Sequence, residues 1–124
     1  MPRLSVRIDL DPDSRIGPGK IELLEHIAAC GSISAGARQM GMSYKHAWDL
    51  IEELNQIFGK PVVSAQTGGK QGGGAQLTSA GLALVRRYRA VERAALKAAE
   101  TQLEALQREV GGDARPEITR KGRS

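Results

Sequence analysis

The most constraining feature of this chain is a short helical segment, a glycine turn and a longer helical segment in close succession. Residues 35–40 are expected to form the short helix, which ends at Gly41 because glycine readily adopts a positive φ. The longer helix is expected over residues 44–58. Its apolar residues have helical spacing: Ala47, Trp48, Ile51, Leu54 and Phe58. A short helix, a tight turn and a longer helix together predict a helix-turn-helix.

A further helix is predicted just before this pair. Residues 18–30 begin with Pro18, which suits a first helical turn, and carry apolar residues at intervals of three and four. Ser32 and Ser43 each precede a helix, where a serine side chain can cap free backbone N–H groups. Cys30 is the single cysteine, which excludes an intrachain disulfide. We expect Cys30 and Trp48 to be buried.

Strand signals lie on both sides of the three helices. Residues 61–65 and 75–77 are short strand candidates that flank a glycine-rich loop, and this order predicts a β-hairpin. Such a hairpin after a helix-turn-helix is called a wing. Near the N-terminus, apolar and polar residues alternate over residues 4–10, which predicts one half-buried strand. Residues 11–13, Asp-Pro-Asp, should end that strand.

A final helix is predicted over residues 79–110, with apolar residues every three or four positions. A helix of this length cannot pack fully on so small a domain, so its far half is expected to meet a second copy of itself. The fold class is therefore mainly α with a small β-hairpin. We expect a winged helix-turn-helix with an N-terminal strand over residues 1–81, a dimerisation helix over 82–110 and a disordered basic tail over 111–124.

Composition limits the classes of function. The net charge of +4 and the pI of about 9.6 are compatible with a polyanionic partner. No apolar run approaches the ~20 residues of a membrane span and no signal peptide is recognisable, so we expect a cytoplasmic protein with no membrane partner. The glycine-rich loop lacks the order of a nucleotide-phosphate loop. Neither a metal spacing nor a catalytic arrangement can be assigned, so we expect no cofactor, no metal and no enzymatic activity.

Several segments resemble one regulator family. These are residues 31–34 (Gly-Ser-Ile-Ser), 43–48 (Ser-Tyr-Lys-His-Ala-Trp) and 67–75, followed by Leu77-Thr78 and Gly81. They resemble the N-terminal domain of the ModE-type molybdate-dependent transcriptional regulators of bacteria. The helix-turn-helix also resembles the LysR type, where a Leu-Thr-x-x-Gly step leads into a linker helix. The resemblance covers roughly residues 4–110.

This resemblance implies a homodimer that binds double-stranded DNA at a two-fold-related operator near molybdate-uptake or molybdoenzyme genes. It also implies C-terminal oxyanion-binding (Mop) domains, which are small β-barrels. Residues 111–124 are too few for a barrel. We therefore expect DNA binding to carry over, but not molybdate sensing by Mop domains.

Nine residues are candidate DNA contacts: Ser32, Ser34, Arg38, Ser43, Tyr44, Lys45, His46, Lys70 and Gln71. The four at the start of the second helix of the motif are expected to read base edges in the major groove, unless they form an ordinary solvated face. The first three would contact phosphates, or the serines would act as caps alone. The last two, at the tip of the wing, would reach phosphates or a flanking minor groove, unless the hairpin is merely flexible.

The function expected from the sequence is sequence-specific regulation of transcription by a homodimer on a palindromic operator. Two alternatives remain open. One is a winged-helix module that has lost DNA binding and acts through protein interactions. The other is a repressor that binds molybdate or another oxyanion directly, without Mop domains.

Overall fold

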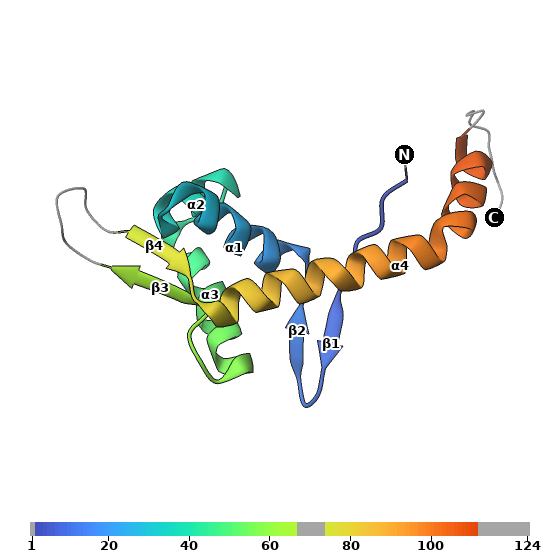
Figure 1. The fold of residues 1–124 in the computed structure, drawn as a ribbon. Helices are drawn as coiled ribbons and strands as arrows, with labels where there is room; N and C mark the ends of the chain where they lie inside the picture. The colour runs from blue at the N-terminus through green and yellow to red at the C-terminus, as the bar shows by residue number, and fades with distance from the viewer. Residues whose placement is uncertain (1, 67–73, 112–124) are drawn as a thin grey trace. The chain divides into compact units, whose positions relative to one another are not determined.

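A computed structural model describes residues 2–66 and 74–111 of the chain. Two β-hairpins and four helices follow one another in this part (Figure 1). Their bounds are β1 Ile8–Leu10, β2 Ser14–Ile16, α1 Pro18–Cys30, α2 Ile33–Gln39, α3 Tyr44–Phe58, β3 Val63–Gln66, β4 Gly74–Leu77 and α4 Ser79–Gly111. The predicted fold class, a mainly helical winged helix-turn-helix with a long last helix, is confirmed.

The described residues fall into two compact units. Residues 5–90 form one unit, which holds both hairpins, α1 to α3 and the beginning of α4. Residues 2–4 and the remainder of α4 from Val91 onward belong to the other unit. The candidate DNA contacts that the structure describes all lie in the first unit.

An aliphatic core holds the first unit together. Helix α1 supplies four fully buried side chains, and α3 supplies three more. Members of the core from these helices are Ile21, Leu23, Leu24, Ile27, Ala47, Ile51 and Leu54. Each large aliphatic side chain contributes about 1.5–3 kcal/mol by leaving water, so this cluster is the main favourable term in folding the unit.

Close packing of α1 on α2 depends on Gly36. A Cβ at this position would lie 2.8 Å from Ile27 Cγ1 and 3.0 Å from the Ile27 backbone nitrogen. Only a residue without a side chain allows the two helices to come so near. At the other end of α2, Gly41 has a φ of +68°, which makes the turn into α3 as predicted.

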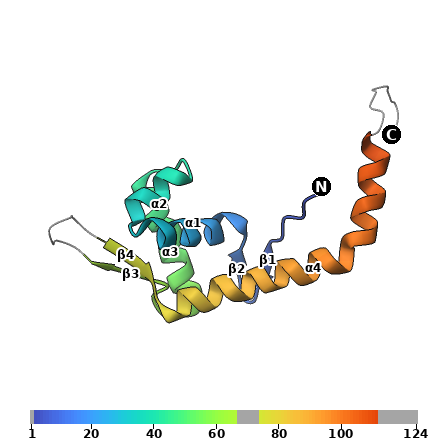
Figure 2. The ribbon, with the colours of Figure 1, turned by 45° about the horizontal axis from the view of Figure 1, so that its top comes forward.

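The β3–β4 hairpin is attached to the helices at its base. Its strands are antiparallel, with Val63 opposite Leu77 and Gln66 opposite Gly74. The amide of Ala75 donates a hydrogen bond of 2.9 Å to the carbonyl oxygen of Gly31, in the turn between α1 and α2. The wing therefore has a fixed anchor on the helix-turn-helix, and Figures 1 and 2 both show it beside α1 and α2.

Two tertiary contacts fasten the beginning of α4 to the rest of the unit. The Tyr88 hydroxyl donates to the carbonyl oxygen of Val6. The Arg89 guanidinium makes two hydrogen bonds to the carboxylate of Glu25 in α1, at 3.0 Å from Nε and 2.6 Å from Nη2. These contacts join segments that lie far apart in the sequence.

Two expectations are corrected. The strand predicted over residues 4–10 is regular only from Ile8 to Leu10, and it pairs with β2, which was not predicted. The reason is that residues 11–13 do not merely end the strand but reverse the chain, so that Ser14–Ile16 returns along it. Cys30 is exposed rather than buried, because the last buried residue of α1 is Ile27 and the final turn faces outward.

Candidate nucleic-acid interface

The beginning of α3 is the most exposed part of the helix-turn-helix. Ser43 caps the helix, since its hydroxyl oxygen accepts a 3.0 Å hydrogen bond from the amide of His46. Tyr44 is 54% exposed, and Lys45 and His46 are exposed as well. The structure thus brings the four predicted reading residues together on one turn, at the positive end of the helix dipole.

Trp48 contacts both the core and this first turn of α3. It is half-buried against the core, so the prediction that it belongs to the core holds for part of its surface. Its ring meets the ring of Tyr44 edge to face, with centroids 6.4 Å apart and planes at 77°. Such edge contacts favour one orientation of an aromatic ring. The contact with Trp48 therefore favours one orientation of the exposed Tyr44 ring.

Helix α2 precedes the turn and presents three more predicted contacts. The Ser32 hydroxyl accepts a 3.0 Å hydrogen bond from the amide of Ala35, which confirms the cap. A capping hydroxyl still has its own hydrogen to donate, so capping and phosphate contact are compatible. Ser34 and Arg38 are exposed on the same helix. Lys70 and Gln71 lie outside the described residues.

Acidic side chains share the exposed surface of α3 with the predicted contacts, and the sequence analysis did not count them as part of this surface. Asp49, Glu52 and Glu53 are all exposed. Asp49 accepts a hydrogen bond of 3.3 Å from Lys45 Nζ, one helical turn away. The signal was available for Asp49 and Glu52, because positions 45, 49 and 52 follow the helical spacing of one face.

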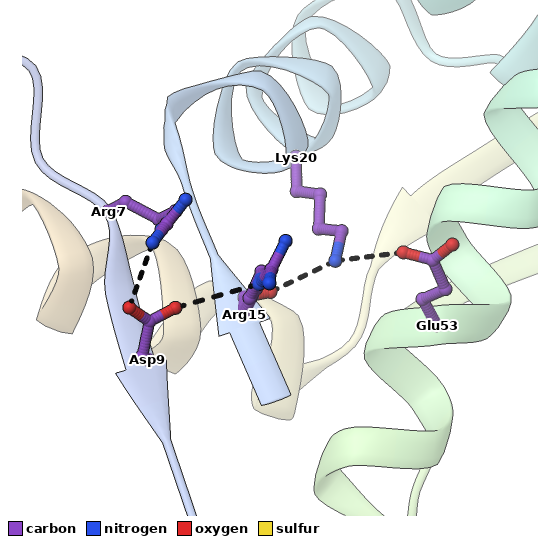
Figure 3. Close-up of polar contacts among 5 residues, drawn as sticks. All are labelled: Arg7, Asp9, Arg15, Lys20 and Glu53. Atoms are coloured by element: carbon purple, nitrogen blue, oxygen red, sulfur yellow. Dashed lines mark hydrogen bonds and ion pairs between the residues drawn. The ribbon is translucent and has the colours of Figure 1, made fainter. Parts of the chain in front are cut away.

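A series of polar contacts joins this face of α3 to the first hairpin (Figure 3). Lys20 Nζ lies 2.9 Å from Glu53 Oε1 and donates to the carbonyl oxygen of Arg15, also at 2.9 Å. The Lys20 side chain is only 16% exposed, so its charge is partly screened from water. The Asp9 carboxylate lies 3.2 Å from Arg7 Nη2, two residues earlier in the chain, and 3.8 Å from Nε of Arg15, its partner on β2.

Other chemistries find little support in the part of the chain that the structure describes. No three metal-ligand side chains gather there around one point. Within residues 2–66 and 74–111, no helix combines the length and the apolar character needed to cross a bilayer. The arrangement on α2 and α3 is instead a polar, exposed surface on two helices that share the aliphatic core.

Comparison with known proteins identifies the family. Residues 19–82 match the bacterial regulatory helix-turn-helix proteins of the lysR family. The molybdenum-pterin-binding protein MopB of Rhodobacter capsulatus is 49% identical over 79 residues, which are 64% of this chain and 29% of MopB. The DNA-binding transcriptional dual regulator ModE of Escherichia coli K12 is 54% identical over 71 residues, 57% of this chain and 27% of that protein.

A longer match is the molybdenum transport protein ModE of Azotobacter vinelandii, 40% identical over 113 residues, which are 90% of this chain and 42% of that protein. The chain therefore spans less than half the length of each of these relatives. The resemblance to ModE-type regulators is confirmed. Since the family match covers more than half of the chain, the protein belongs to the lysR family of bacterial regulatory helix-turn-helix proteins.

Proposed function

We propose that the protein is a homodimeric regulator that binds a palindromic operator in a sequence-specific manner and controls molybdate-related genes. One observation carries the proposal: the serine-capped beginning of α3, where Tyr44, Lys45 and His46 are all exposed on one helical turn. In a helix-turn-helix, this end of the second helix enters the major groove. Lysine donates to guanine O6 and N7 or to phosphate, and the neighbouring side chains can reach either.

The remaining predicted contacts would fix the register of the protein on DNA. Ser32, Ser34 and Arg38 lie on α2, which in this motif crosses the phosphate backbone. Lys70 and Gln71 would add contacts from the wing to a flanking groove or phosphates. The two roles separate experimentally, since base contacts change sequence preference whereas phosphate contacts change affinity for all DNA.

Apolar side chains on the part of α4 from Val91 onward support a homodimer. Val91 and Leu96 are each 43% exposed, Leu106 is 59% exposed and Val110 is 70% exposed. Large apolar residues repeated along a helix outside a core are typical of an interface between helices. A two-fold dimer would present two copies of α3 to successive major grooves, about 34 Å apart, and would therefore select a palindrome.

The names of the relatives suggest the target genes. They include a molybdenum-pterin-binding protein, a molybdenum transport protein and a transcriptional dual regulator called ModE. We infer that this chain acts on genes of molybdenum uptake or use. Whether an oxyanion acts on it directly can be checked by calorimetry with molybdate, tungstate and sulfate, where heat for molybdate alone would identify the effector.

The proposal is tested by selecting bound sequences from a random DNA pool and measuring their affinity by fluorescence anisotropy. We expect a palindromic motif and an affinity that falls with salt, because each phosphate contact contributes about −0.9 to the slope of log K against log[salt]. Lys45→Ala should weaken binding. Lys60→Ala is the matched control, since Lys60 is also exposed but lies beyond the far end of α3.

Three results would contradict the proposal. Salt-independent binding, or the absence of any motif, would favour the alternative of a protein-interaction module. Equal affinity of Lys45→Ala and the parent for every sequence would remove Lys45 from the interface. A monomer in sedimentation velocity, at concentrations that saturate the operator, would exclude the homodimer.

A further inference from the structure

We propose that Asp49 is a specificity-determining residue of the DNA interface, whose carboxylate accepts a hydrogen bond from the amino group of cytosine in the major groove. The inference rests on the proposed role of α3 as the recognition helix. It goes beyond that role because it assigns a base preference to an acidic residue, on a surface that must approach a polyanion.

The position of Asp49 on α3 favours a contact with a base. It lies at the centre of the exposed face of α3, one turn after Lys45 and His46 and one turn before Glu52 and Glu53. Its side chain is 54% exposed. The rise of an α-helix places it about 6 Å along the helix axis from Lys45, on the same face of the helix. A helix inserted far enough for Lys45 to reach a base edge therefore brings Asp49 to a nearby base pair.

The other two carboxylates of α3, Glu52 and Glu53, have partners that are not predicted DNA contacts. Glu53 is paired with Lys20 at 2.9 Å, away from the start of the helix (Figure 3). Glu52 accepts a 3.4 Å hydrogen bond from the side-chain amide of Asn55. Asp49 instead contacts Lys45 at 3.3 Å. It is thus the carboxylate that shares a contact with one of the proposed reading residues.

The donors and acceptors of the major groove decide which base a carboxylate can contact. An ionised carboxylate only accepts hydrogen bonds. Phosphates, guanine O6 and N7 and thymine O4 are acceptors as well, so a carboxylate cannot hydrogen-bond to them. Adenine offers a donor at N6, but its N7 acceptor lies beside it. Thymine O4, a second acceptor, flanks adenine N6 on its other side, whereas cytosine N4 has an acceptor, guanine O6, on one side only. Asp and Glu are its usual partners. A carboxylate here opposes binding to most sequences and favours those with cytosine at one position.

The contact with Lys45 makes the pair a single reading unit. Lysine donates to guanine and aspartate accepts from cytosine, so the two side chains together match G·C pairs at neighbouring positions. Because their charges are opposite, the pair adds no net charge to the face. Lys45 alone would attract any phosphate, and Asp49 lowers this non-specific attraction.

The test compares Asp49→Asn with Glu52→Gln, which removes the same charge from the same face one turn farther on. Each variant and the full-length parent are put through selection from a random DNA pool, followed by anisotropy on operators with single base-pair changes. Both variants should bind non-specific DNA at least as well as the parent, since each loses a negative charge. Only Asp49→Asn should lose a preference for a G·C pair at one position of each half-site, by on the order of tenfold or more.

Every outcome decides the matter. If the parent selects a motif with that G·C pair and only Asp49→Asn relaxes it, the inference stands. If the parent selects a motif but Asp49→Asn keeps every preference, or Glu52→Gln relaxes the same position, the inference is overturned while the proposed function survives. A parent motif without a fixed G·C pair has the same consequence. If the parent selects no motif, both fail. Asp49→Ala, with circular dichroism as the check on folding, confirms that the change comes from the lost carboxylate.

Discussion

Replacing Gly81 with alanine should destabilise the protein, although alanine is the better helix former. Gly81 is buried in the first turn of α4, and a Cβ there would lie 2.1 Å from the carbonyl oxygen of Val62 and 3.1 Å from its carbon. Both atoms belong to the backbone, so no side chain can rotate away. Relief of the clash requires α4 to move from the segment that precedes β3.

That movement would break a small network of hydrogen bonds. The Val62 oxygen accepts from the amide of Thr78 at 3.0 Å. The Thr78 hydroxyl donates to the Pro61 oxygen at 2.8 Å and accepts from the Gly81 amide at 3.1 Å. Loss of two such bonds costs about 2 kcal/mol, and overpacking adds about 1–3 kcal/mol. The gain in helix propensity returns about 1 kcal/mol. We therefore expect a net loss of about 2–4 kcal/mol in the free energy of unfolding.

Urea unfolding followed by circular dichroism and by Trp48 fluorescence measures this loss. Parent and variants must be compared at one protein concentration, because dimerisation would make stability concentration-dependent. Gly19→Ala is the matched control, since Gly19 is exposed in the first turn of α1 and a Cβ there meets no atom within 4 Å. It should be neutral or stabilising by up to about 1 kcal/mol. A Gly81→Ala variant as stable as the parent would refute the reasoning.

Two further predictions concern single contacts. Ser43→Ala should lower the free energy of unfolding by about 1 kcal/mol, because it removes the 3.0 Å cap on the amide of His46. Ser34→Ala, on the exposed face of α2, is the control and should change the free energy of unfolding little. An equal loss in both variants would contradict the role of Ser43 as a cap. A double-mutant cycle on Glu25 and Arg89 should give a coupling of about 1 kcal/mol that weakens with salt, since the bidentate pair is 39% and 29% exposed. No coupling at low salt would show that the pair does not hold α4 on α1.

The local elements followed from the sequence closely. Helices α1 and α3 have the predicted bounds, residues 18–30 and 44–58. Both are marked by signals that act over a few residues: an apolar period, a capping residue or proline at the start, and glycine at the end. The helix α2 begins at Ile33, two residues before the predicted start, because the Ser32 cap precedes it directly.

The candidate site was predictable in part for the same reason. The turn that carries Tyr44, Lys45 and His46 is exposed because α3 packs on the core through its apolar stripe, which lies on the other side of the helix. The contact of Lys45 with Asp49 was not predicted, although the two residues have the i, i+4 spacing at which helical side chains meet. The exposure of Cys30 could not be derived from its residue type, since burial depends on which neighbours pack over the end of α1.

The sequence by itself determined the four helices, the glycine turn and the wing, because helical period, capping and turn chemistry are short-range effects. The tertiary structure decided what no period could indicate: that Ser14–Ile16 folds back on β1, that Gly36 and Gly81 lie where backbone segments nearly touch, and that α4 is fastened through Tyr88 and Arg89. The last two contacts span 82 and 64 residues of chain. Contacts of that range form only once the aliphatic core has brought the segments together, so they depend on packing and leave no periodic trace in the sequence.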